Sequence, residues 1–153
     1  MGKPAEIRYA TVRLRRVAAR LLAGEAGGEP ATSETLVAAS SRLLDRLSHR
    51  LAEVIGPAGV EAILLRAVKL RRAEYSFLDE AIVPRARGES LAEPLRACLR
   101  DQPPEVVQEV SVILFATVVG LLAFVIGDRL AWSLLQQIWP DTLPQAEWQE
   151  AEE

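Results

Sequence analysis

A long apolar run toward the C-terminus constrains this chain more than any other feature. Residues 110–127 are 18 consecutive positions without a charged side chain, and only Ser111 and Thr117 among them are polar. A helix that is apolar on every side is either the centre of a helical bundle or a membrane span. Because about 18 such residues just reach across the hydrocarbon core of a bilayer, length alone does not separate these two interpretations.

The residues around the run favour the bundle. Glu105 and Glu109 precede it and Asp128 follows it, whereas membrane spans usually carry Lys or Arg on their cytoplasmic side. The earlier segments of the chain show apolar residues at helical spacing, and each such stripe needs a surface to cover. The sequence therefore predicts an all-α fold of five to six helices around a long, highly apolar central helix over about residues 104–138. The alternative is a single-pass membrane protein with a span at 110–127 and a cytoplasmic helical head.

Glycine and proline divide the rest of the chain. A first helix is expected over residues 4–23 and a second over 33–55, after which Gly56-Pro57 ends the second helix and opens a third. Arg71 falls on the apolar face of that third helix. Either the aliphatic part of the Arg71 side chain packs on this face while its guanidinium reaches water, or the helix ends near this residue.

Two further signals mark helix boundaries. Ser90 followed three residues later by Glu93 predicts a capping box at the start of a fourth helix. A central helix of about 35 residues would be about 52 Å long, which exceeds what a compact domain of this size can enclose. We therefore expect the central helix to bend, with Gly127 as the hinge, because glycine weakens a helix.

The length of 153 residues predicts one domain. We expect a single helical domain over residues 1–140, with a flexible linker at 24–33, and an acidic, partly disordered tail at 141–153 that adds little to stability. Residues 1–100 hold 17 Lys and Arg against 12 Asp and Glu, whereas residues 101–153 hold one Arg against nine Asp and Glu. This asymmetry either guides a partner or a head-to-tail contact, or has no specific role.

Small residues form one stripe of the central helix, and we take them as candidate interaction residues. They are Ala116, Gly120, Ala123 and Gly127. Small side chains let another helix approach closely, which in water indicates a packing groove and in a membrane a dimerisation face.

Two rows of arginines are the other candidates for binding. Arg13, Arg16 and Arg20 share the outer face of the first predicted helix, and Arg42, Arg46 and Arg50 form a row on the second. Aligned arginines can bind phosphates or an acidic protein surface. The net charge of −3 makes nucleic acid the less favoured partner and favours a solvated face or an acidic protein.

The residues with catalytic or metal-binding chemistry do not form a recognisable site. His49 is the only histidine, with Asp45 and Glu53 one turn away on either side, and this pattern is more typical of a solvated face than of a metal site. Cys98 is the only cysteine and lies on the inward face of the fourth predicted helix, which indicates a buried structural thiol. A single Cys cannot form an internal disulfide, so nothing argues for an oxidising compartment. We predict no catalytic residue, no cofactor and no metal.

The sequence thus favours a non-enzymatic, cytoplasmic helical interaction module that binds a protein partner or itself through apolar helix surfaces, a homo-oligomer being one such form. One alternative is an inner- or plasma-membrane protein that spans the bilayer at 110–127 with its N-terminus in the cytoplasm. A second is a helical bundle that binds a small apolar ligand.

Overall fold

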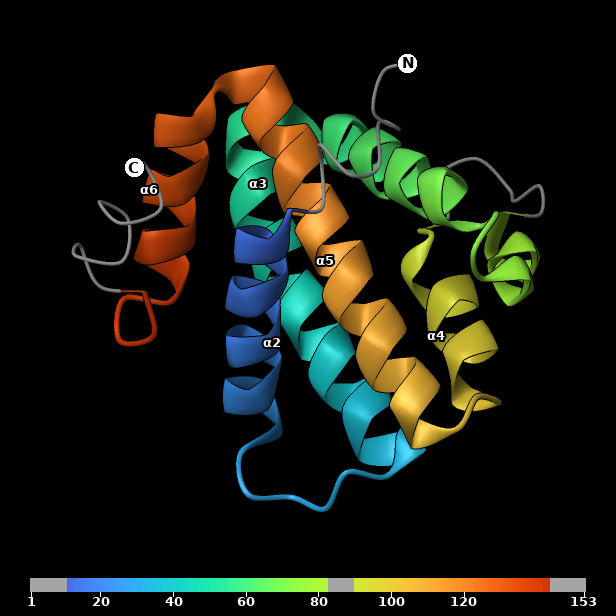
Figure 1. The fold of residues 1–153 in the computed structure, drawn as a ribbon. Coiled ribbons are helices and arrows are strands. Elements are labelled where there is room, and N and C mark those ends of the chain that lie inside the picture. The colour runs from blue at the N-terminus through green and yellow to red at the C-terminus, as the bar shows by residue number, and fades with distance from the viewer. Residues whose placement is uncertain (1–10, 83–89, 144–153) are drawn as a thin grey trace.

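The computed structural model describes residues 11–82 and 90–143. Within these ranges the elements are helices: α2 (Val12–Ala26), α3 (Ser33–Arg71), the 3₁₀ helix η1 (Ser76–Ile82), α4 (Ala92–Arg100), α5 (Pro104–Ile126) and α6 (Asp128–Ile138). Helix α5 runs through the middle of the bundle, beside α2 and α3, and α6 folds back at the left of the view, in contact with α5 and α3 (Figure 1). The predicted all-α bundle around an apolar central helix is confirmed.

Helix α5 forms the core because it offers an apolar surface in every direction. Every residue from Leu114 to Leu122 is buried, and Val110, Ala116 and Leu122 are fully covered. Among the described residues α5 is the one helix long and apolar enough to cross a membrane, and 61% of its most apolar 18-residue stretch is buried inside the bundle. Length and composition alone do not distinguish a core helix from a span, as the sequence already indicated.

The central helix changes direction at Gly127, the expected hinge, but it does not continue to residue 138 as one bent helix. Helix α5 ends at Ile126, and Gly127 has φ 95° and ψ 151°, outside any helical conformation. The Gly127 amide donates to the Ala123 carbonyl at 2.8 Å and closes α5, and α6 starts at the next residue. Gly127 is therefore a complete break that reverses the chain, because it adopts a backbone conformation open essentially to glycine alone.

The boundary expected at Gly56-Pro57 is present as a sharp kink inside α3. Gly56 has φ 83° and ψ 158°, and helical structure resumes at once with Pro57 in its first turn. Helix α3 then ends at Arg71. Of the two alternatives for this residue, the one in which the helix ends there is therefore the one observed. The charged end of Arg71 does not reach water: only 3% of its side chain is exposed, and its Nε donates to Thr117 Oγ1 on α5 at 3.0 Å.

The expected capping box at Ser90 is wrong, because a residue distant in sequence serves the start of α4. Glu61 on α3 accepts the Leu91 amide at 3.0 Å and the Ser90 hydroxyl at 3.2 Å. The Ser90 hydroxyl accepts the Ala92 amide at 3.0 Å. Glu93 instead pairs with arginines of its own helix. A tertiary contact has thus replaced the local one.

The ends of the bundle differ slightly from expectation. Helix α2 continues past Gly24 to Ala26, so the connection to α3 begins at Gly27 and not at residue 24. At the C-terminus Leu143 is only 1% exposed, and the Trp139 ring meets Phe115 edge to face, with ring centroids 5.9 Å apart. The core therefore extends into the first residues of the expected tail. Residues 1–10 of the first predicted helix and 144–153 of the tail lie outside the described residues.

Truncation of the α5 core should destabilise the protein strongly. Leu114→Ala and Leu122→Ala each remove a buried side chain, and we expect each to lower the free energy of unfolding by about 2–5 kcal/mol. The control is Leu130→Ala, where 46% of the residue is exposed and the change should stay within about 0.5 kcal/mol. Denaturant unfolding measures both, and equal effects at the three positions would contradict the assignment of α5 as the core.

Candidate functional site

Most of the large apolar side chains that remain exposed gather at one end of the bundle. This apical end is where α3 bends, α5 ends and α6 begins, whereas α2 begins farther down the bundle (Figure 1). Among the described residues the exposed large apolar side chains are Val12, Val54, Phe124, Val125 and Leu130. All of them except Val12 lie at this end, and we call Val54, Phe124, Val125 and Leu130 the apical surface. Single exposed apolar residues are ordinary on proteins. Their concentration at one end is the feature that indicates an interaction site.

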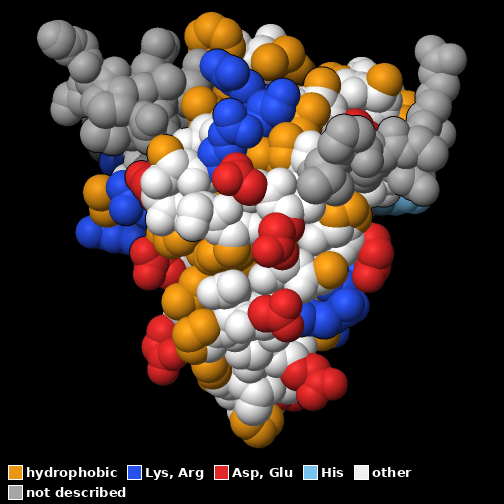
Figure 2. Space-filling model, turned by 90° about the vertical axis from the view of Figure 1, so that its right-hand side faces the viewer, with side chains coloured by type: hydrophobic (Ala, Val, Ile, Leu, Met, Phe, Trp, Pro, Cys, Tyr) orange, Lys and Arg blue, Asp and Glu red, His pale blue; other side chains and the backbone are white. Residues whose placement is uncertain are grey.

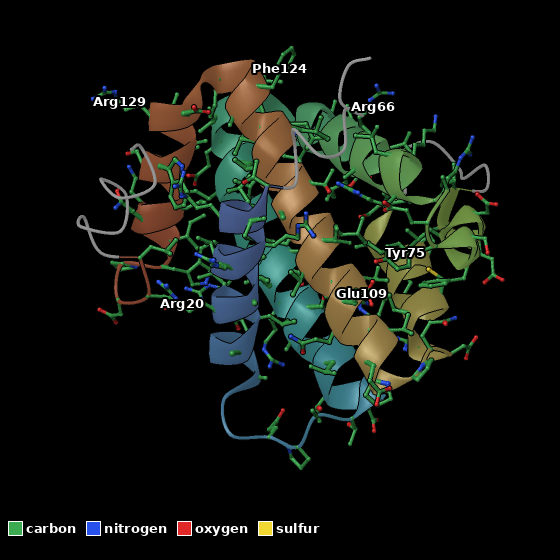
Figure 3. The ribbon with its side chains drawn as sticks, viewed as in Figure 1. Arg20, Arg66, Tyr75, Glu109, Phe124 and Arg129 are labelled. Atoms are coloured by element: carbon green, nitrogen blue, oxygen red, sulfur yellow. The ribbon has the colours of Figure 1, made fainter. Side chains whose placement is uncertain are left out.

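The reversal at Gly127 is what places Phe124 and Val125 outside the core. They occupy the last turn of α5, beyond the stretch that neighbouring helices cover, and remain 64% and 62% exposed. Figure 3 shows Phe124 at the outer edge of this turn, with Arg129 to one side of it and Arg66 to the other. The same charge-free run therefore builds the centre of the bundle and its most exposed apolar side chains.

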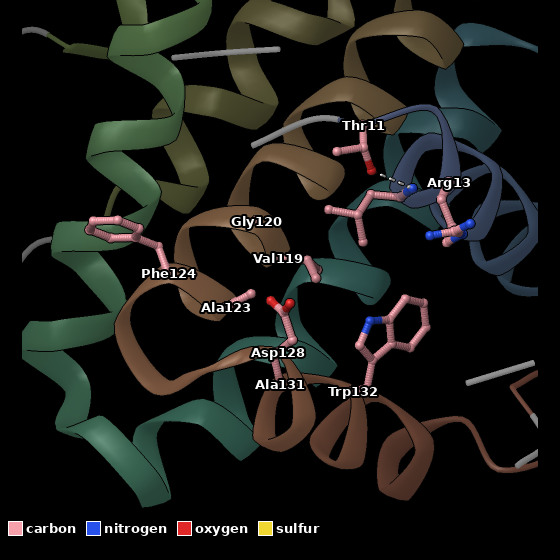
Figure 4. Close-up of a pocket in the computed structure, with 10 residues that line it drawn as sticks. Thr11, Arg13, Val119, Gly120, Ala123, Phe124, Asp128, Ala131 and Trp132 are labelled. Carbon is pink, nitrogen blue, oxygen red and sulfur yellow. Dashed lines mark hydrogen bonds between the residues drawn. The ribbon is translucent and has the colours of Figure 1, made fainter. Parts of the chain in front are cut away.

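A cavity of about 290 Å³ lies beside the apical surface. It is lined by residues from α2, α5 and α6, including Leu14, Gly120, Ala123, Phe124 and Trp132. Figure 4 shows the Asp128 carboxylate directed into this space. The cavity joins an apolar wall to one acidic group, and Phe124 belongs both to its lining and to the apical surface.

The stripe of small residues is divided between the core and the apical end. Ala116 is fully buried, Gly120 and Ala123 line the cavity, and Gly127 forms the exposed turn. Helix α2 packs against α5 and contributes Leu14 to the same cavity. A neighbouring helix of the same chain thus lies where the sequence predicted a groove.

The first arginine row lies on the exposed face of α2, and its members have different surroundings. Arg13 is exposed and lines the cavity, whereas Arg16 is exposed outside it. Arg20 donates to the Thr142 carbonyl at 3.4 Å and so links α2 to the C-terminal segment. The structure does not gather the three around one binding site.

The second arginine row holds the bundle together. Arg42 donates to the Glu25 carbonyl at 2.7 Å and Arg46 pairs with the Glu25 carboxylate. Arg46 also donates to the Ile138 carbonyl at 2.9 Å, and its guanidinium lies 5.2 Å from the centre of the Trp139 ring. These residues join α2, α3 and the end of α6. Sequence reasoning missed the contact because Glu25 fell in the expected linker.

A tyrosine–carboxylate pair on the side of the bundle also escaped the sequence analysis. The Tyr75 hydroxyl donates to Glu109 Oε2 at 2.5 Å and ties the segment after α3 to α5 (Figure 3). Burial and the adjacent Glu109 raise the pKa of Tyr75 above its ordinary value, so the phenol stays protonated and remains a donor. No spacing in the sequence indicates this pair.

The two residues with nucleophilic or metal-binding chemistry lie apart from the apical end. His49 is exposed on α3, and among the described residues no group of three His, Cys, Asp or Glu side chains could hold a metal ion. Cys98 is 3% exposed, and burial, with a smaller contribution from Glu80, raises the pKa of its thiol to about 11. Its Sγ contacts the Leu95 carbonyl oxygen at 3.2 Å. Such a thiol is neutral near pH 7 and a poor nucleophile.

No protein-family model, curated protein or solved structure matches this chain.

Substitution of Gly127 tests the conformation that creates the apical turn. Gly127→Ala meets no atom within 4 Å, so its cost comes from the backbone at φ 95°, and we expect a loss of about 1–3 kcal/mol in the free energy of unfolding. Gly24→Ala is the matched control, because Gly24 lies inside α2 with equally open surroundings and no positive φ. It should stabilise the protein by about 0.5–1 kcal/mol. Thermal or denaturant unfolding gives both values, and a stabilising Gly127→Ala would show that the turn does not need glycine.

The thiol of Cys98 should react slowly in the folded protein. Its raised pKa keeps the thiolate fraction low in the folded state at pH 8, and only the thiolate attacks a thiol reagent. Because the folded pKa lies above the unfolded one, the resulting stabilisation is present below about pH 8.5 and is lost as the pH rises toward 11. Absorbance of the released product of a disulfide reagent, with and without denaturant, measures the difference. Equal rates in both conditions would contradict the burial of Cys98.

Proposed function

We propose that this protein is a non-enzymatic helical interaction module that binds through its apical surface. The observation that supports this proposal is that Val54, Phe124, Val125 and Leu130 share one end of the bundle. Fully covering a large apolar side chain that is otherwise exposed is worth about 1.5–3 kcal/mol. These side chains are 44–64% exposed, so each can contribute part of that amount on binding.

The surroundings of α5 support a bundle over a membrane span. Every residue from Leu114 to Leu122 is covered by other parts of the same chain, so lipid could reach that stretch only if α2, α3 or α6 moved away. The exposed part of the apolar run is confined to its last turn, at Phe124 and Val125. A partner can therefore reach the C-terminal tip of α5, whereas the stretch from Leu114 to Leu122 is covered by other helices.

The cavity is compatible with the same proposal, and it gives less support to the alternative of a bundle that binds a small ligand. Its volume of about 290 Å³ lies at the lower limit of pockets that bind drug-sized molecules, about 300 Å³. Phe124 belongs to its lining, so a partner that covers the apical surface also contacts the edge of the cavity.

Substitution of Phe124 tests the proposal. Phe124→Ser removes the most exposed aromatic side chain, and we expect weaker retention on a phenyl-substituted matrix and a lower average mass in light scattering wherever the protein self-associates. Phe124→Tyr is the matched control, because it keeps most of the ring area and should behave like the unaltered protein. Neither variant should shift the melting temperature, since the residue is exposed. If Phe124→Ser changes neither retention nor mass, the apical surface is not an association surface and the proposal fails.

A further inference from the structure

We infer that the apical surface docks on the headgroup region of an anionic lipid bilayer. This inference rests on the proposed function and names its partner. Three observations carry it: the charges that surround the apical surface, the shape of that end, and the absence of a complementary apolar surface on the rest of the described chain.

The exposed charges are divided between the two ends of the bundle. Near the apical end the exposed arginines are Arg66 and Arg129, with Asp128 and a Glu53 that is paired with Arg50. Arg13, Arg15 and Arg16 lie farther down the bundle, along α2. Where α2 ends and α3 and α5 begin, the exposed acidic residues are Glu29, Glu34, Asp101 and Glu105. On the face drawn in Figure 2, the uppermost basic side chains lie among apolar ones, and acidic side chains predominate below them.

This polarity orients the protein at a negative surface. The apical arginines would lie toward anionic headgroups, and each Lys or Arg near such a surface adds about fivefold to binding. The acidic end would point into the water, where it is not repelled by the headgroups. The linear charge asymmetry of the sequence thus becomes, in three dimensions, an asymmetry between the two ends.

The shape of the apical end suits shallow insertion. Phe124 and Val125 project from the tip of the α5–α6 turn, with Arg66 and Arg129 on either side (Figure 3). Peripheral proteins bury apolar side chains about 5–10 Å into the boundary between headgroups and acyl chains. A protruding turn can reach this depth while the basic residues stay at headgroup level, and α5 need not leave the bundle.

A second copy of the chain is a less suitable partner. Contact between two apical ends would bring both sets of arginines together. Contact between an apical end and the acidic end would satisfy the charges, but the described residues offer no exposed large apolar side chain there. Phe124 and Val125 would then face a polar surface, and the main driving force for association would be lost.

Vesicle flotation of the full-length protein tests the inference. The probes are vesicles of phosphatidylcholine alone and vesicles of phosphatidylcholine with phosphatidylserine. We expect binding to the second kind only, and weaker binding at high salt, because salt shortens the reach of the arginine charges. Phe124→Ser should weaken the binding about tenfold, which is the effect of losing one inserted aromatic side chain.

A second set of variants tests the contribution of the arginines near the apical surface. Arg66→Gln combined with Arg129→Gln should weaken binding to the anionic vesicles by about 25-fold, at about fivefold for each charge. Arg100→Gln is the matched control, because Arg100 is also exposed but lies at the end of α4 beside acidic residues, and this variant should bind like the unaltered protein. All substituted side chains are exposed, and unchanged melting temperatures would verify that the fold is kept.

The outcomes separate this inference from the proposed function. If the protein is retained by the phenyl matrix through Phe124 but binds neither kind of vesicle, the lipid inference is overturned and the interaction module stands. Equal binding to both kinds of vesicle, or equal binding by Phe124→Ser and the unaltered protein, also overturns it. If Phe124→Ser alters neither vesicle binding nor retention nor self-association, both proposals fail.

Discussion

Burial of a charge-free helix on all its sides is the constraint on which this structure depends. The residues from Leu114 to Leu122 leave no face of α5 suited to water, and the other helices are arranged to cover them. Helices α2 and α3 lie beside α5, and α6 folds back in contact with it. Where the coverage ends, at Phe124 and Val125, the apolar run continues into the solvent. The core and the proposed binding surface are therefore two parts of one sequence feature.

The fold was largely predictable because local patterns determine it. The apolar run predicts the central helix, and Gly56-Pro57 and Gly127 mark the positions where the chain changes direction. How far the chain turns at these glycines was not predictable. Gly56 and Gly127 have nearly the same backbone angles, φ 83° and ψ 158° against φ 95° and ψ 151°, and each redirects the chain between two helical segments. What the following segment packs against is decided by distant parts of the chain, which periodicity does not encode.

Contacts between distant residues account for what the sequence did not reveal. Glu61 supports the start of α4 from another helix, and Glu25 binds two arginines from a segment that reads as a linker. These carboxylates occupy positions without any local signal. The candidate site was predictable only in part: the small residues Gly120 and Ala123 do lie at its cavity. The exposure of Phe124 and Val125 became visible only once the covering helices were in place.

The bond between Arg71 and Thr117 has a consequence for the uniqueness of the packing. A helix that is apolar all round can be rotated or shifted along its axis with little change in the apolar area that it buries. Thr117 is one of only two polar side chains in the charge-free run, and its hydroxyl both donates to the Ile113 carbonyl at 2.6 Å and accepts from Arg71 Nε at 3.0 Å. Any other register would leave the Nε of the buried guanidinium without this acceptor, at a cost of about 1–3 kcal/mol, while the pair of Arg71 with Glu74 would remain. One hydroxyl thus favours this alignment of α5 over others that are equally apolar.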